Sequence, residues 1–221
     1  PMTCSIEAWS RFLSTCSKVF NHAPIAMGPV TAERIRRLPV LSAPLPLKSI
    51  ALSMQPALEA LGSHLIRPDL EALLPYLPWQ LRGASENYAW VELIGPDGIQ
   101  YAADFRVGLY WQDADALYPL HRHNAAELYY IFTGAAGWQR GDEQEIIRPS
   151  GSYFLHTSGQ CHSTRTYSQQ LLSIWAWDGD IGWESYTVDP APHNGVDDAD
   201  FRLVVHRKIL ISLGKRKQKT S

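Results

Sequence analysis

The fold of this chain is decided by the stretch YPLHRHNAAELYYIFTG, residues 118–134. His121 and His123 are two residues apart, so in an extended strand both imidazoles leave the same face, and Glu127 and Tyr129 repeat this spacing on the next strand. Two neutral imidazoles and one carboxylate can then converge on one divalent ion. Such mixed nitrogen and oxygen ligation suits iron(II), zinc, manganese, nickel or cobalt, and it leaves positions open for a substrate.

Length and composition predict a soluble globular protein. The 221 residues suffice for one domain, or one domain with an appended segment. Hydrophobic residues at 45% and charged residues at 19% exclude a disordered chain, and no apolar run reaches the roughly 18 residues of a membrane span. The formal net charge is -2, so the chain does not carry the broad positive field expected of a dedicated nucleic-acid binder. We therefore expect neither nucleic acid nor membrane as a partner.

The cysteines and the first residues favour a cytoplasmic location. The three cysteines show no CxxC spacing. Glu7, Arg11 and Lys18 fall where a signal peptide needs an apolar stretch. A reducing cytoplasm is the predicted compartment.

The chain changes character near residue 79. Ten of the fifteen prolines lie in residues 1–78, and seven of the eight tryptophans lie between residues 79 and 183. We expect an N-terminal helical region over 1–78, a metal-binding barrel over 79–205 and a solvated basic tail over 206–221. The spacing of apolar residues predicts four helices, at Ser5–Phe20, Thr31–Leu38, Pro56–Leu65 and Pro68–Leu74. Paired prolines predict an extended segment at Leu41–Leu47. The sequence leaves three roles open for the helices: covering the barrel mouth, forming a homodimer contact, or shielding a sheet face.

From residue 88 onward, short β-rich runs alternate with glycine-bearing turns. Many short strands at this spacing indicate an antiparallel sandwich or barrel. The predicted strands are Tyr88–Ile94, Ile99–Ala102, Phe105–Trp111, Leu128–Thr133, Gly137–Arg140, Glu145–Ile147, Ser152–Leu155, Ser163–Tyr167 and Leu171–Trp177.

Two stretches resemble the paired motifs of the cupin family. His-x-His, Glu and Gly from residue 121 to 134 match the first motif, although Asp115 occupies the position of its leading glycine. Gly151, Thr157, Gly159 and His162 match the second, with threonine where proline is usual. The resemblance implies a mainly β fold, a double-stranded β-helix barrel, in which His121, His123, Glu127 and His162 bind one metal. His156 competes with His162 for the fourth position, and the Gly159-x-x-His162 spacing favours His162.

Tyrosines frame the first motif. Tyr129 shares a strand face with Glu127, so its phenol should point into the barrel, whereas Tyr130 should point to the other side. Tyr118 lies three residues before His121 and is close enough to reach the same pocket. A nearby divalent cation favours a phenolate, which can remove an acidic C–H proton, while a metal-bound carboxylate stabilises the developing enediolate. These parts suit β-elimination.

The sequence is similar at this point to the bacterial dimethylsulfoniopropionate (DMSP) lyases of the cupin type. The similarity rests on Tyr118-x-x-His121-x-His123-x-x-x-Glu127-x-Tyr129, the later His162 and the segment Trp175-Ala176-Trp177. It implies cleavage of DMSP to dimethyl sulfide and acrylate, with Tyr129 as the α-proton base and Tyr118 as an assisting or substrate-positioning phenol. The choice of base between the two tyrosines stays open.

The substrate implied by this resemblance is a small zwitterion with a sulfonium group. A sulfonium has no hydrogen-bond donors, so aromatic faces are suitable hosts. Trp175 and Trp177 share a strand face and are the expected hosts. Four aromatic residues on earlier strands are further candidates for the same cavity, namely Tyr88, Trp90, Tyr110 and Trp111.

Two other functions use the same ligands. An iron(II) dioxygenase would use the open metal positions for oxygen, and a non-enzymatic cupin sensor would bind a small ligand without turnover. Oxygen uptake would favour the first, and ligand-induced melting shifts without turnover would favour the second.

Overall fold

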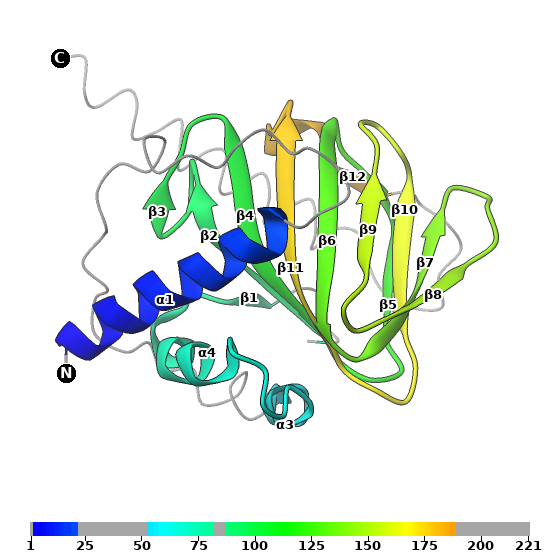
Figure 1. Ribbon diagram of the computed structural model, residues 1–221. Coiled ribbons are helices and arrows are strands. Elements are labelled where there is room, and N and C mark those ends of the chain that lie inside the picture. The colour runs from blue at the N-terminus through cyan, green and yellow to red at the C-terminus, as the bar shows by residue number, and fades with distance from the viewer. Residues whose placement is uncertain (1, 22–52, 82–86, 189–221) are drawn as a thin grey trace, which may run out of the picture.

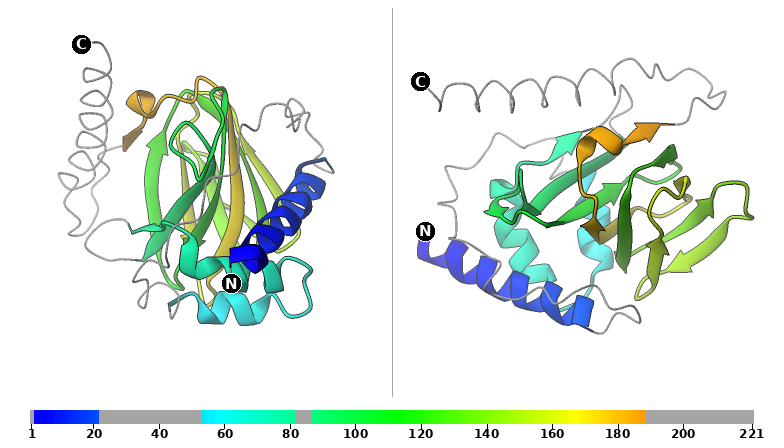
Figure 2. Two further views of the ribbon diagram at one scale, coloured as in Figure 1. Left: turned by 90° about the vertical axis from the view of Figure 1, so that its left-hand side faces the viewer. Right: turned by 90° about the horizontal axis from the view of Figure 1, so that it is seen from above.

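The structure, a computed structural model, describes residues 2–21, 53–81 and 87–188. Two β-sheets face each other, and helices cover the outer face of the larger sheet (Figures 1 and 2). The fold is therefore mainly β, with the α-helical region that the sequence predicted on its N-terminal side. Within the described residues, no helix is both long and apolar enough to cross a bilayer.

The strands form one sheet of seven and one of five. The larger runs in the order β1 (Gln80–Leu81), β2 (Tyr88–Gly95), β4 (Phe105–Gln112), β11 (Leu171–Gly179), β6 (Ala125–Thr133) and β9 (Tyr153–His156), with β3 (Gln100–Tyr101) beside β2. The smaller runs in the order β12 (Thr187–Val188), β5 (Leu117–Arg122), β10 (His162–Thr166), β7 (Ala135–Arg140) and β8 (Ile146–Pro149). Neighbouring strands are antiparallel except β2 and β3, which confirms the predicted antiparallel class.

Each predicted β-rich run overlaps a strand, and three strands lie outside those runs. These are β1, β5 and β12. Strand β5 contains Pro119, a residue that lacks a backbone donor and lowers the strand signal of its segment. The two-residue strands β1 and β12 form through their partners β2 and β5, so local sequence gives little sign of them.

The described helices confirm three of the four predicted ones. Helix α1 (Met2–Asn21) contains the range Ser5–Phe20, and it buries Ala8, Trp9, Phe12 and Cys16 along one face. Helices α3 (Gln55–Ala60) and α4 (Arg67–Leu73) have proline in the first turn, as expected, and α4 continues into the 3₁₀ turn η2 (Leu74–Tyr76). The predictions for Thr31–Leu38, Leu41–Leu47 and the tail 206–221 fall outside the described residues.

The helices shield the outer face of the larger sheet. Their buried side chains form one core with alternate residues of β2, β4 and β11, including Val91, Leu109 and Ile174. An ion pair of 2.8 Å between Arg11 and Asp69 joins α1 to α4. Of the three roles that the sequence left open, shielding a sheet face is the one that these contacts support.

A glycine ends the first motif. Gly134 lies between β6 and β7 with a φ of 84°, a conformation that L side chains rarely adopt. A Cβ added there would also approach the Gln170 carbonyl oxygen to 2.0 Å. The turn therefore needs glycine to carry the chain from one sheet to the other.

Candidate metal centre and substrate pocket

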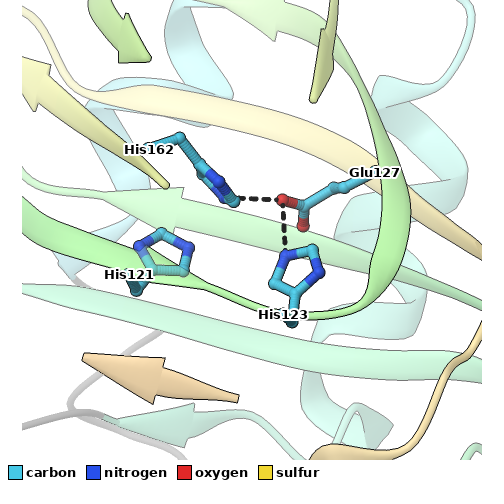
Figure 3. Close-up of side chains that lie close together, drawn as sticks. All are labelled: His121, His123, Glu127 and His162. Atoms are coloured by element: carbon cyan, nitrogen blue, oxygen red, sulfur yellow. Dashed lines mark hydrogen bonds and ion pairs between the residues drawn. The ribbon is translucent and has the colours of Figure 1, made fainter. Parts of the chain in front are cut away.

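Four buried side chains from both sheets converge inside the barrel. His121 lies near the end of β5 and His123 directly after it, Glu127 lies on β6, and His162 lies at the start of β10, where it pairs in register with His121. Each offers one ligand atom, and these atoms all lie within 4.8 Å of one another (Figure 3). The structure thus brings together the four residues that the cupin motifs implied.

Backbone carbonyls orient the three imidazoles. The Nδ1 atoms of His121, His123 and His162 lie 2.9, 3.0 and 2.7 Å from the carbonyl oxygens of Pro119, Ala125 and Gln160. A carbonyl oxygen only accepts, so each Nδ1 carries a proton and donates it. Each ring therefore has Nε2 as its ligand atom, and its orientation is fixed by a hydrogen bond, as is usual for metal-binding histidines.

The charges of the cluster fit a divalent cation. Oε2 of Glu127 lies 3.2 Å from Nε2 of His123 and 3.0 Å from Nε2 of His162 (Figure 3). Since both Nδ1 atoms already donate, donation from both Nε2 atoms as well would require two imidazolium ions around one carboxylate. A divalent cation supplies the same two charges while both imidazoles remain neutral, so these residues fit a metal ion with three nitrogen ligands and one oxygen ligand.

The pKa values of Glu127 and His121 are both lowered in this cluster, for different reasons. Burial alone would raise the pKa of Glu127, but the charges and hydrogen bonds of His123 and His162 outweigh it and hold the pKa well below the usual value. Burial lowers the pKa of His121 well below its ordinary value, and the charge of His162 adds to this effect. Glu127 as a carboxylate and His121 as a neutral imidazole are the forms that bind metals.

Trp177 orients the carboxylate ligand. It pairs in register with Glu127, and its Nε1 donates to Oε1 of Glu127 at 2.7 Å. The second oxygen, Oε2, is then the one turned toward the histidines. The ring of Trp177 also lies 4.0 Å from that of His123. Trp177 thus contacts two of the four clustered residues, Glu127 and His123.

An aromatic pocket opens next to the cluster. It contains about 370 Å³ of space between atoms, including some open to solvent, which suits a small molecule. The lining residues are Trp90, Tyr110, Tyr118, His121, Glu127, Tyr129, Trp175, Trp177, Trp183 and Tyr186. None of these described lining residues is Lys or Arg. The wall can therefore accept a cation, while an anionic group of a ligand must be held elsewhere.

Six of the eight aromatic residues expected in the pocket line it. Tyr118, Tyr129, Trp175 and Trp177 line the pocket, as expected. Trp90 and Tyr110 do so as well, and Tyr88 packs behind Tyr118 with the ring centroids 4.7 Å apart. The prediction for Trp111 was wrong, because the alternation of β4 turns its side chain to the helix-covered core.

Burial opposes ionisation of two of the pocket tyrosines, Tyr129 and Tyr110. It raises the pKa of Tyr129 well above its ordinary value, and the Glu127 carboxylate adds to the effect. It also raises the pKa of Tyr110, with Tyr118 as the next cause. In the arrangement of protein groups alone, both phenols are therefore protonated.

A comparison with models of known protein families assigns the chain to one of them. Residues 23–173 match the model of the dimethylsulfoniopropionate lyases. The chain belongs to this family. It is 31% identical over 97 residues to the dimethylsulfoniopropionate lyase DddQ of Ruegeria pomeroyi, a match that covers 43% of this chain and 48% of that relative. The matched segment thus spans about half the length of the curated relative.

Solved structures support the same fold. The crystal structure of DMSP lyase DddQ from Ruegeria pomeroyi DSS-3 superposes with a TM-score of 0.70 at 22% identity, covering 85% of this chain and 99% of that one. A chain from the crystal structures of the DMSP lyases RdDddP and RnDddQII gives 0.67 at 19% identity, with 84% and 99% covered. The likeness confirms the barrel and the helical region as one shared architecture.

His156 lies beside the cluster of His121, His123, Glu127 and His162 and is not one of its four residues. Its ring stacks on His162, with centroids 3.7 Å apart and planes inclined by 15°. It is fully buried, and neither ring nitrogen has a hydrogen-bond partner among the described residues. The geometry therefore agrees with the spacing argument that favoured His162 as the fourth ligand.

Sequence reasoning missed two pocket residues, Trp183 and Tyr186. Both belong to the segment that follows β11, where the 3₁₀ turn η3 (Trp183–Ser185) leads into β12. The predicted strands ended at Trp177, and this segment has no strand periodicity. The only available signal was that both residues are aromatic and lie close to Trp177 in the sequence, six and nine residues after it.

Proposed function

We propose that this chain is a metal-dependent lyase that cleaves DMSP to dimethyl sulfide and acrylate by β-elimination. One observation carries the proposal: a buried three-histidine, one-glutamate cluster and a wall of tryptophans share a single pocket. DMSP has a carboxylate at one end and a sulfonium at the other, so it matches both features. Family membership supports the same reaction.

His121, His123, Glu127 and His162 would hold one divalent ion, of the kind that nitrogen and oxygen donors accept: iron(II), zinc, manganese, nickel or cobalt. When bound, such an ion supplies a Lewis acid that anchors the substrate carboxylate, stabilises the charge developing on it and favours the phenolate of a nearby tyrosine. This role agrees with the lack of Lys and Arg among the described lining residues.

The tryptophans would hold the sulfonium. Trp183 lies 5.2 Å from Trp90 and 4.7 Å from Trp177 between ring centroids, and Trp175 lies 5.7 Å from Trp177. Four indole rings thus surround one side of the pocket. Each face in contact with a cation contributes about 0.5–2 kcal/mol, and the rings also exclude water that would compete for the substrate.

Tyr129 is the proposed base and Tyr118 the proposed positioning phenol. Tyr129 pairs in register with Trp175 and lines the pocket beside Glu127. Its oxygen would take the α-proton of the substrate. The electron pair of the broken C–H bond then forms the double bond of acrylate, and the carbon–sulfur bond breaks with its pair leaving on neutral dimethyl sulfide.

The reaction can be tested with purified, metal-loaded protein and DMSP. We expect dimethyl sulfide in the headspace and acrylate in solution in equal amounts, with no oxygen consumed. Substrate loss coupled to oxygen uptake would contradict the proposal and favour a dioxygenase. Ligand-induced stabilisation without either product would favour a sensor.

Two finer predictions accompany this function. We propose a cytoplasmic location, which cell fractionation would test. We also keep the homodimer as a proposal, and the mass of the protein in solution, measured by light scattering, would decide it.

A further inference from the structure

The segment Asp180–Val188, here called the mouth segment, is held by hydrogen bonds from residues far away in the sequence. Arg106, which is buried and paired with Glu92 at 2.6 Å, donates from Nε to the Ile181 carbonyl at 2.9 Å. In addition, the Asn124 side chain donates to Asp180 at 2.8 Å, and its backbone N–H donates to Ser185 at 3.1 Å. Pairing of β12 with β5 fixes the end of the segment.

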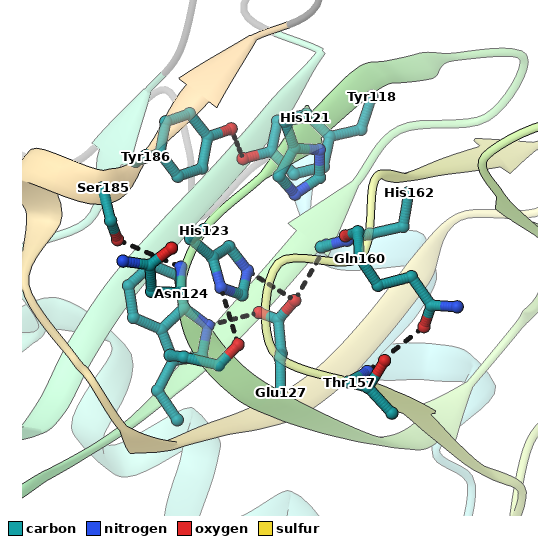
Figure 4. A network of polar contacts seen from close by, with 12 residues as sticks. Tyr118, His121, His123, Asn124, Glu127, Thr157, Gln160, His162, Ser185 and Tyr186 are labelled. Atoms are coloured by element: carbon teal, nitrogen blue, oxygen red, sulfur yellow. Dashed lines mark hydrogen bonds and ion pairs between the residues drawn. The ribbon is translucent and has the colours of Figure 1, made fainter.

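These hydrogen bonds hold Tyr186 next to Tyr118 and His121. Its hydroxyl lies 2.6 Å from the hydroxyl of Tyr118, a short hydrogen bond between two phenols (Figure 4). Its ring is nearly parallel to that of His121, at a centroid distance of 5.3 Å and an angle of 24°. It is 9% exposed. A buried aromatic residue from a non-repetitive segment thus contacts both a proposed ligand and a proposed catalytic phenol.

We propose that Tyr186 is a positioning residue of this site, which acts by holding the hydroxyl of Tyr118 in one place on the pocket wall. The inference rests on the proposed lyase function and extends it to the mouth segment. The ring of Tyr118 is already confined between Tyr88 at 4.7 Å and His121 at 4.3 Å. Ring packing does not set the direction of a phenol O–H bond, whereas a hydrogen bond to the Tyr186 hydroxyl favours one direction.

This arrangement makes the effects of the two hydroxyls dependent on each other. If Tyr186 works through Tyr118, removing its hydroxyl matters only while the Tyr118 hydroxyl is present. Residues that share a hydrogen bond show such coupling, whereas independent sites give additive effects. The substitution to Phe keeps both rings and removes only the hydroxyl, and with it the hydrogen bond between the two phenols.

The test is a double-mutant cycle of Tyr118→Phe and Tyr186→Phe on metal-loaded protein. We expect Tyr186→Phe to lower kcat/KM for DMSP about tenfold, mainly through kcat, and by less than about twofold in the Tyr118→Phe background. Metal content should stay at one ion per chain. The same cycle on the free energy of unfolding should show coupling, a measurement that needs no turnover. Tyr101→Phe, on a side chain that is 53% exposed, is the control and should change nothing in either background.

Several results would overturn the inference. These are an equal loss in both backgrounds, an unchanged kcat/KM in Tyr186→Phe, or coupling seen only in unfolding. If the wild-type protein releases no dimethyl sulfide, the lyase function fails instead. The inference is then decided by acrylate binding, measured by calorimetry over the same cycle: coupled losses of affinity support the positioning role, and additive or absent losses refute it.

Discussion

The two faces of the larger sheet carry different chemistry on alternate residues of the same strands. On β11, Ile174 and Ala176 belong to the helix-covered core, whereas Trp175 and Trp177 line the pocket. All four are buried. Burial therefore does not separate structural from functional residues here, but the face of the strand does.

The difference shows what each face is built for. The helix-covered face consists largely of aliphatic side chains such as Val91 and Leu109, which stabilise the fold through close packing. The pocket face buries polar groups at a cost in stability, including Glu127 and the two ring nitrogens of His156, which have no hydrogen-bond partner among the described residues. Substitutions on the first face should change stability, and those on the second should change chemistry.

Adjacent tyrosines give the strongest test of this division. Tyr129 lines the pocket, while Tyr130 packs against the helix-covered core. We expect Tyr129→Phe to lower kcat/KM for DMSP about 1,000-fold, because it removes the proposed base. Tyr130→Phe should stay within about twofold, and both variants should keep one metal ion per chain by elemental analysis. Substantial activity in Tyr129→Phe would refute the assignment of the base.

The helix-covered face should give the reverse result. Ile174 is fully buried there, so Ile174→Ala should lower the free energy of unfolding by about 3 kcal/mol through the cavity that it leaves. Thermal and denaturant unfolding measure this loss. The folded fraction should keep its kcat/KM within about twofold. Ile174→Val is the milder control, at about 1 kcal/mol. A large change in kcat with little change in stability would break the division.

Two tryptophans, one lining the pocket and one on the helix-covered face, also test the division. Trp183→Leu should raise KM for DMSP about tenfold, because one cation-binding face is lost. Trp111→Phe, on the helix-covered face, should lower stability and leave KM unchanged. Steady-state kinetics on both variants decide the point. Equal KM values in wild-type protein and Trp183→Leu would remove Trp183 from the sulfonium site.

A smaller effect is expected from acid, which should lower the stability of the metal-free protein through His156 on the pocket face. Burial lowers the pKa of His156 well below its ordinary value, with the charge of His162 as the next cause, so the folded protein keeps this ring neutral where the unfolded chain protonates it. The metal-free protein should therefore be most stable above the unfolded pKa of about 6.5 and lose stability as pH falls, by up to about 1.4 kcal/mol per pH unit for this group.

His156→Phe checks this expectation while it keeps a ring on His162. Unfolding of metal-free protein between pH 7 and pH 5 should show a shallower slope in the variant than in the wild type. His121, whose pKa burial also lowers, should maintain part of the slope in both. Identical slopes would mean that His156 takes up no extra proton on unfolding.

The sequence predicted those parts of the site that depend on strand alternation. The spacing of His121, His123, Glu127 and Tyr129 was enough to place their side chains together, because a two-residue period fixes the face. The same rule applied to Trp111 would have excluded it from the pocket, since it is next to Tyr110 on β4.

Other parts of the site depend on long-range contacts. Trp183 and Tyr186 reach the pocket because Arg106 and Asn124, far away in sequence, hold the mouth segment across it. No local pattern encodes such anchoring. Strand β12 is similarly set by its pairing with β5, since two residues carry no periodicity of their own.

Metal titration tests the central claim most directly. Protein stripped of metal by a chelator should release no dimethyl sulfide from DMSP, and stepwise addition of iron(II), zinc or manganese should restore release for at least one ion. The rate should rise linearly and level off at one ion per chain. His123→Ala, which lacks one proposed ligand, should remain inactive throughout the titration. Full activity in the stripped protein, or restoration of His123→Ala at one ion per chain, would contradict a lyase that depends on the His121, His123, Glu127 and His162 cluster.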